Sequence, residues 1–121
     1  MNTEEKNKLI AEFMGLEIVN ADIILYELNG IAYPINKLHY HKSWDWLMPV
    51  VEKIESFQDG DDGDSMRGHL YNFRIEQNFV YILDGESMGI FGRDVIIEMN
   101  GDNKLDATYN AVVEFINQYN N

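Results

Sequence analysis

The chain has 121 residues, of which 45% are hydrophobic and 12% aromatic, and 21 acidic against 9 basic residues give a formal net charge of −12. This composition predicts a single globular domain, residues 1–121, and the lack of cysteine excludes disulfides and thiol catalysis. The charge argues against direct binding of nucleic acid, because phosphate contacts need Lys and Arg, and it favours a basic protein surface or a cation as partner. Solubility alone also accounts for such a charge.

Residues 1–8 are polar and no long apolar run follows them, so we expect a cytoplasmic protein without a signal peptide or a membrane span.

The first predicted element is a helix that ends at Gly15. Asn2 and Glu5 have the spacing of a capping box. Apolar positions 9, 10, 13 and 14 share one helix face, and Gly15 followed by Leu16 fits a Schellman cap, in which a left-handed residue ends the helix.

A hairpin is expected next. Residues 17–28 are rich in Ile, Val and Leu and predict a strand, and Asn29-Gly30 predicts a tight turn after it. A type I′ turn requires positive φ at both central residues, which Asn and Gly tolerate better than other residues. Residues 31–35 are the expected returning strand, and Pro34 marks an edge position because it has no N–H for a ladder hydrogen bond.

The central segment, residues 43–54, predicts a helix that begins after an N-cap at Ser43. Apolar side chains recur there at helical spacing and form a stripe that we expect to be buried: Trp44, Leu47, Val51 and Ile54. Trp46 falls off this stripe, so we expect its side chain to be partly exposed. Pro49 lies beyond the first turn, where it should remove one backbone hydrogen bond and bend the helix.

The C-terminal half predicts an antiparallel sheet followed by a helix. Residues 57–65 are acidic and contain glycine, which predicts a loop, and strict alternation over residues 70–76 predicts a half-buried strand. Two more strands are expected at 79–83 and 88–99, the latter bent at Gly92.

The last helix is expected to begin at an Asp102 cap and to carry an apolar stripe from Leu105 to Tyr119. The predicted fold class is therefore α+β, an antiparallel β-meander packed against helices, in the order α-β-β-α-β-β-β-α.

No pattern in the sequence supplies a catalytic or metal site. His39 and His41 are two residues apart and would share one face of a strand, but a metal there would need further ligands. The acidic segment 59–64 does not fit a calcium loop, because the positions that must be Gly and Glu carry other residues. The segment 85–89 has Gly-x-Ser-x-Gly spacing, but it lies between two predicted strands rather than between a strand and a helix. The sequence favours a non-enzyme without metal or cofactor and leaves open an enzyme with no local motif.

Aromatic and basic side chains form the candidate binding set. Near His39 and His41 the aromatic residues are Tyr33, Tyr40, Trp44 and Trp46, and the basic residues of the predicted sheet half are Arg67, Arg74 and Arg93. An exposed aromatic ring beside His or Arg can stack a base while the cation holds a phosphate. The candidate ligand-binding residues are His39, Tyr40, His41, Trp46, Arg67, Arg74 and Arg93. Ordinary packing in the core and at its rim explains the same residues without a ligand.

Three segments resemble a family of small uncharacterised proteins of bacteriophages and prophages. They are residues 7–15, residues 40–55 with the sequence YHKSWDWLMPVVEKIE, and residues 111–116; the central one is the specific segment. The resemblance does not extend to the predicted sheet or the acidic loop, and it carries over no catalytic residues. It implies a phage context, in which small accessory proteins often block host defences or redirect host enzymes.

These observations lead to two binding hypotheses of different class. In the first, the chain is a non-catalytic phage counter-defence protein that sequesters a small nucleotide-like immune signal in the host cytoplasm. In the second, it is an acidic mimic of nucleic acid that blocks a basic site on a host nuclease or another DNA-binding enzyme. A structural or accessory phage protein is the third hypothesis. Exposed apolar surface on a small sheet also leads us to expect a homo-oligomer.

Overall fold

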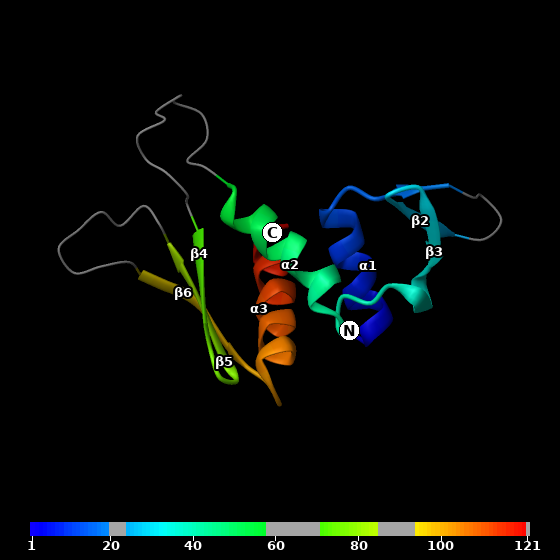
Figure 1. Cartoon of the computed structure of the whole chain (residues 1–121). Helices are drawn as coiled ribbons and strands as arrows, with labels where there is room; N and C mark the ends of the chain where they lie inside the picture. The colour runs from blue at the N-terminus through cyan, green and yellow to red at the C-terminus, as the bar shows by residue number, and fades with distance from the viewer. Residues whose placement is uncertain (20–23, 58–70, 85–93, 121) are drawn as a thin grey trace, which may run out of the picture.

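The computed structural model describes residues 1–19, 24–57, 71–84 and 94–120. The helices and strands follow the order of the chain (Figure 1) as α1 (Thr3–Phe13), β1 (Glu17–Ile18), β2 (Leu25–Leu28), β3 (Ile31–Pro34), the 3-10 helix η1 (Ile35–Lys37), α2 (Trp44–Glu55), β4 (Tyr71–Glu76), β5 (Phe79–Asp84), β6 (Asp94–Asn100) and α3 (Lys104–Tyr119). Over these ranges, no helix has both the length and the apolar character needed to cross a membrane.

The predicted α+β class is confirmed, with two antiparallel three-stranded sheets. One sheet has the order β1-β2-β3 and the other is a meander, β4-β5-β6. The single strand expected over residues 17–28 is wrong, because this stretch forms two strands that pair with each other, Ile18 opposite Tyr26. An apolar, β-branched composition indicates extended backbone but does not say where the chain reverses.

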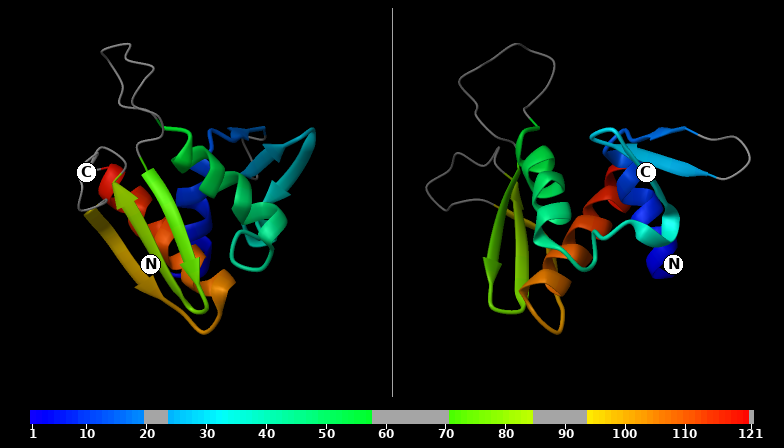
Figure 2. Two further views of the ribbon diagram at one scale, coloured as in Figure 1. Left: turned by 60° about the vertical axis from the view of Figure 1, so that its left-hand side comes forward. Right: turned by 45° about the vertical axis from the view of Figure 1, so that its right-hand side comes forward.

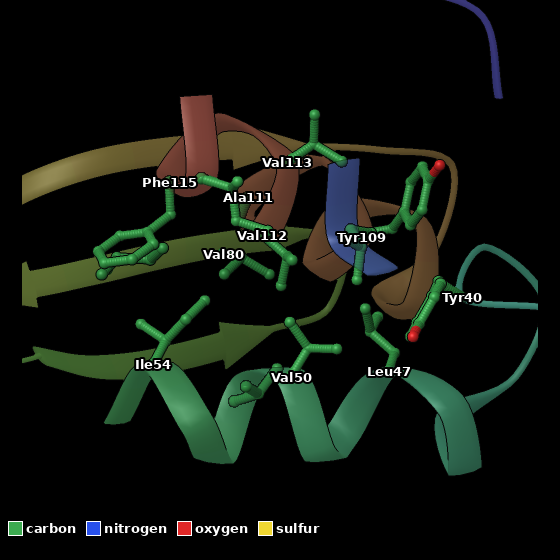
Figure 3. Packing of buried hydrophobic residues seen from close by; sticks show 14 of the residues in the cluster. Tyr40, Leu47, Val50, Ile54, Val80, Tyr109, Ala111, Val112, Val113 and Phe115 are labelled. Atoms are coloured by element: carbon green, nitrogen blue, oxygen red, sulfur yellow. The ribbon is translucent and has the colours of Figure 1, made fainter. Parts of the chain in front are cut away.

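The helices separate the two sheets. Figures 1 and 2 place α2 and α3 against one face of the β4-β5-β6 sheet, and α1 lies on the far side of α3 next to the small sheet. Figure 3 shows Leu47, Val50 and Ile54 pointing from α2 toward α3 and toward Val80 of β5. One cluster of buried side chains therefore joins the helices to both sheets, since it also includes Tyr26 of β2.

The two ends of α1 are capped as the sequence predicts. The backbone N–H of Glu5 donates to the Asn2 side-chain oxygen at 2.8 Å. At the other end, Gly15 has φ +75°, and the backbone N–H of Leu16 donates to the Ala11 carbonyl at 3.0 Å. This is the bond of a Schellman cap, so the left-handed glycine ends the helix where expected.

The predicted hairpin is also confirmed. Asn29 and Gly30 have φ values of 53° and 84°, as a type I′ turn requires. The turn joins β2 to β3, in which Tyr26 pairs with Tyr33. β3 is an edge strand of its sheet and ends at Pro34, the position predicted for an edge.

Helix α2 has the predicted extent but a different buried face. Its buried residues are Leu47, Val50, Val51 and Ile54, whereas the side chain of Trp44 is 37% exposed, so the prediction of a buried Trp44 is wrong. The helix packs on α3 and β4, and Trp44 is its first residue, three positions before Leu47, the first residue of the buried set. Ser43 is at the N-cap, but its hydroxyl makes no capping bond; its carbonyl accepts from the Leu47 N–H at 3.0 Å.

The meander and the last helix agree with the prediction except at two positions. The cap of α3 is Asn103, whose side-chain oxygen accepts from the Asp106 N–H at 2.9 Å, and not Asp102. Asp106 in turn accepts from the Asp102 N–H, so two adjacent cap-forming residues take different roles. Tyr119 is 58% exposed rather than part of a buried stripe, although its ring stacks on Phe57 at 5.4 Å.

Several sequence predictions lie outside the described residues. These are the acidic loop after Phe57, the Gly-x-Ser-x-Gly segment at 85–89, and the first part of the strand expected at 88–99 with its bend at Gly92. The strand expected at 79–83 and the later part of the one expected at 88–99 are present as β5 and β6.

Candidate aromatic binding pocket

A pocket of about 390 Å³ lies where the small sheet meets the first half of α2. The β2-β3 hairpin forms one wall, α2 the other, and Met14 closes the side next to the end of α1. Its lining consists of Met14, Leu28, Asn29, Ile31, Tyr33, Tyr40, Asp45, Trp46 and Pro49. This volume is in the range of pockets that hold small organic ligands.

Trp46 is the centre of an aromatic group at this pocket. Its ring meets Tyr33 at 5.0 Å and Tyr40 at 5.2 Å between centroids, with interplanar angles of 79° and 89°. A third ring, His39, meets it at 5.7 Å and 85°. All three contacts are edge-to-face, which fixes the orientation of the indole. Trp46 is half-buried, as the sequence predicts.

Tyr40 is the most deeply placed of the lining residues. Its side chain is 2% exposed, and this burial raises the pKa of its hydroxyl to about 12. The phenol therefore stays protonated at neutral pH and acts as a hydrogen-bond donor or as an uncharged ring.

His39 and His41 do not share one face. They lie in a turn, in which the His39 carbonyl accepts from the N–H groups of Lys42 and Ser43, both at 3.0 Å, and not in a strand. His39 turns to Trp46, whereas Nδ1 of His41 contacts the amide of Asn7 at 3.0 Å. Within the described ranges, no three His, Cys, Asp or Glu side chains are grouped as metal ligands would be.

A buried hydrogen-bond network lies behind this turn. The amide nitrogen of Asn7 donates to the Leu38 carbonyl and to His41 Nδ1, both at 3.0 Å, and the amide oxygen accepts from the Tyr109 hydroxyl at 2.9 Å. Asn7 is 2% exposed, so the network holds α1, the turn and α3 together away from water. No local motif signals it, because its members are up to 102 positions apart in sequence.

The network also sets the state of His41. Because the Leu38 carbonyl can only accept, the NH₂ group of Asn7 must face it and must also donate to Nδ1 of His41. Burial, with the charges of Lys42 and His39 as smaller causes, lowers the pKa of His41. Geometry and desolvation thus both favour the neutral imidazole.

The predicted arginines do not join the pocket in the part of the chain that the structure describes. Arg74 is an exposed residue of β4, paired with Tyr81, on the opposite face of the sheet from the buried Ile82 and Val80. The helices lie against the other face of the meander (Figure 2). Arg74 therefore faces away from them, whereas Trp46 lines the pocket at the small sheet. Arg67 and Arg93 lie outside the described residues.

The chemistry of the pocket differs from that expected for a phosphate site. Among its described lining residues, the only ionisable groups are Asp45 and the two tyrosines. Asp45 is exposed, which places the carboxylate at the mouth, while Tyr40 lies at the bottom. The binding residues predicted from the sequence include Tyr40 and Trp46 but not Asp45. Tyr33 belongs to the aromatic group that the sequence indicates near His39 and His41, and the fold brings its hairpin against α2.

No protein-family model matches the chain, and no match was found among curated proteins or solved structures. The resemblance to the phage family therefore stays a prediction.

Proposed function

We propose that the protein is a non-catalytic binding protein that holds a small organic ligand in the aromatic pocket. The observation that carries this proposal is the hollow of about 390 Å³ between the hairpin and α2, walled by the rings of Tyr33, Tyr40 and Trp46. Rings held edge-to-face by their neighbours are preorganised, so little side-chain freedom is lost on binding.

The role that we propose for this binding is sequestration. In a phage context, a protein that holds a small host immune signal without converting it would act as a counter-defence protein in the host cytoplasm. A nucleotide-like signal could stack its base on Trp46 or Tyr33. Its phosphates would have to stay outside the pocket, because the described lining offers no Lys, Arg or His to pair with them.

Nuclear magnetic resonance with a panel of small ligands tests the proposal. Nucleosides, nucleotides, amines and quaternary ammonium compounds are titrated into ¹⁵N-labelled protein, and shifts are followed at the Trp46 indole and the Tyr33 amide. We expect saturable shifts for at least one class, lost in Trp46→Leu and kept in Trp44→Leu, since Trp44 is absent from the lining. Shifts confined to another surface, or none with any class, would contradict the proposal.

The sequestration role needs a separate measurement. Native mass spectrometry of the protein after incubation with extract of phage-challenged cells should reveal a retained small mass in the wild type and not in Trp46→Leu. A retained mass that is chemically altered on release would instead indicate an enzyme.

Mimicry of nucleic acid is the second candidate, and one feature of the small sheet favours it. Glu17 and Glu27 are exposed and lie directly opposite each other on β1 and β2, where like charges oppose pairing. Glu12 is near the same sheet, since its charge adds to burial in raising the pKa of Tyr26. Mimicry predicts salt-sensitive binding to a purified host nuclease that is weakened by Glu17→Gln with Glu27→Gln and unaffected by Trp46→Leu.

A further inference from the structure

We infer that the pocket takes an organic cation, namely a quaternary or methylated ammonium head group. This inference rests on the proposed binding function and narrows it to a ligand class. It depends on the aromatic walls, on the charge at the mouth, and on the apolar composition of the remaining lining.

The walls supply the first argument. The face of an aromatic ring carries negative charge density, and a cation near it is attracted, most strongly by Trp and next by Tyr. Three such rings, Tyr33, Tyr40 and Trp46, line this one pocket. Tyr33 and Trp46 are half-buried and keep accessible ring surface, whereas Tyr40 is 2% exposed and supports the Trp46 ring edge-to-face.

The charges supply the second argument. Asp45 lies in the first turn of α2 and lines the mouth of the pocket, where its carboxylate can neutralise a bound cation. Among the described lining residues there is no Lys, Arg or His to repel a cation or to attract an anion. The net charge of −12 gives the surrounding field the same preference.

The composition of the remaining lining supplies the third argument. Met14, Leu28 and Ile31 are apolar, so the ligand must carry an apolar surface around its charge. A compact, strongly hydrated ion such as sodium would exchange its water for few oxygen ligands, whereas methyl groups on nitrogen both spread the charge and pack on apolar walls. A methylated ammonium group satisfies the rings, the carboxylate and the apolar side chains together.

A matched pair of probes tests the inference. Choline and its uncharged carbon isostere, 3,3-dimethylbutan-1-ol, have the same shape and differ in the charge of one atom. The titration uses Trp44→Phe protein, in which Trp46 is the only tryptophan, because the chain has two. The measured quantity is the change in Trp46 fluorescence as each probe is added.

We expect choline to bind saturably and at least on the order of tenfold more tightly than the isostere. Asp45→Asn should weaken choline binding several-fold and leave the isostere unchanged. Glu52→Gln is the matched control, since Glu52 is an exposed carboxylate of the same helix that does not line the pocket. A thermal unfolding curve of each variant confirms that the fold is retained.

The possible outcomes distinguish failure of the cation inference from failure of the proposed binding function. If both probes bind equally, or if Asp45→Asn and Glu52→Gln weaken choline to the same extent, the cation inference is overturned and the binding function remains. If choline does not bind but a nucleoside or another uncharged ligand binds at Trp46, the cation inference is likewise overturned and the binding function remains. If no ligand of any class reaches Trp46, both are overturned.

Discussion

The amide of Asn7 donates a hydrogen bond to Nδ1 of His41 at 3.0 Å, and this contact makes the neutral imidazole part of the folded structure. His41 follows directly after Tyr40, the residue at the bottom of the aromatic pocket. The buried network behind the turn therefore positions one wall of the proposed site.

The first prediction concerns the pH dependence of stability. The pKa of His41 is lowered below its usual value of 6.5 in the folded protein, so the unfolded chain binds the proton first as the pH falls. Unfolding is then favoured below about pH 6.5, and stability rises with pH through the window between the folded and unfolded pKa values.

Urea unfolding at pH 7.5, 6.5 and 5.5 checks this dependence. The loss of stability toward pH 5.5 should be smaller in His41→Gln than in the wild type. Equal slopes in the two proteins would mean that groups other than His41 cause the whole dependence.

The second prediction concerns Asn7 itself. Asn7→Ala removes the partner of the Leu38 carbonyl, of His41 Nδ1 and of the Tyr109 hydroxyl, and the first and last of these groups belong to buried residues. We expect a loss of about 2 to 4 kcal/mol in the free energy of unfolding. Lys8→Ala on the same helix removes only a solvent-exposed ion pair with Glu12 and should cost under about 0.5 kcal/mol. Chemical denaturation gives both values, and similar losses would contradict the network.

The third prediction compares two glycines. A Cβ added at Gly101 would lie 2.6 Å from the backbone nitrogen of Ala107 in α3, a contact that cannot relax without moving the helix. Gly101→Ala should therefore lower the free energy of unfolding by about 2 kcal/mol or more. Gly30→Ala meets no atom within 4 Å and is penalised only by its φ of +84°, by about 1 kcal/mol. The order of the two unfolding free energies is the test, and it fails if Gly30→Ala is the more harmful change.

The fourth prediction distinguishes the buried face of α2 from the one expected from sequence. Leu47 is 0% exposed, so Leu47→Ala should lower the free energy of unfolding by about 3 kcal/mol. Trp44→Ala should cost about 1 kcal/mol despite the larger side chain, because Trp44 is 37% exposed. If thermal or urea unfolding shows a larger loss of stability for Trp44→Ala than for Leu47→Ala, Trp44 is part of the buried face, as the sequence predicts.

Features that depend on near neighbours in the chain could be predicted from the sequence. The cap of α1 at Asn2, the left-handed end at Gly15 and the hairpin turn at Asn29-Gly30 all follow from the conformations that these residues tolerate. The predicted cap of α3 is wrong by one residue, because Asp102 and Asn103 are equally able to cap a helix. In the structure the Asp106 N–H donates to the Asn103 side chain, whereas the Asp102 N–H donates to the Asp106 carboxylate.

The candidate site could be predicted only in part. Tyr40 and Trp46 are close in sequence, so the sequence groups them, whereas the contact of Tyr33 with Trp46 needs a hairpin that folds back on α2. Residue type alone groups Arg74 with Trp46, because both suit a nucleotide, but the position of Arg74 in β4 turns it away from the helices.

The sequence alone determined the α+β class, the main helices and strands, and the caps and turn, since each is set by backbone preferences and periodicity over a few residues. Tertiary structure decided which face of α2 is buried, the network that joins Asn7 to Tyr109, and the pocket between the hairpin and α2. These features depend on which surfaces of separate elements meet, and that is settled by the combined burial of apolar area and the pairing of buried polar groups across the whole chain.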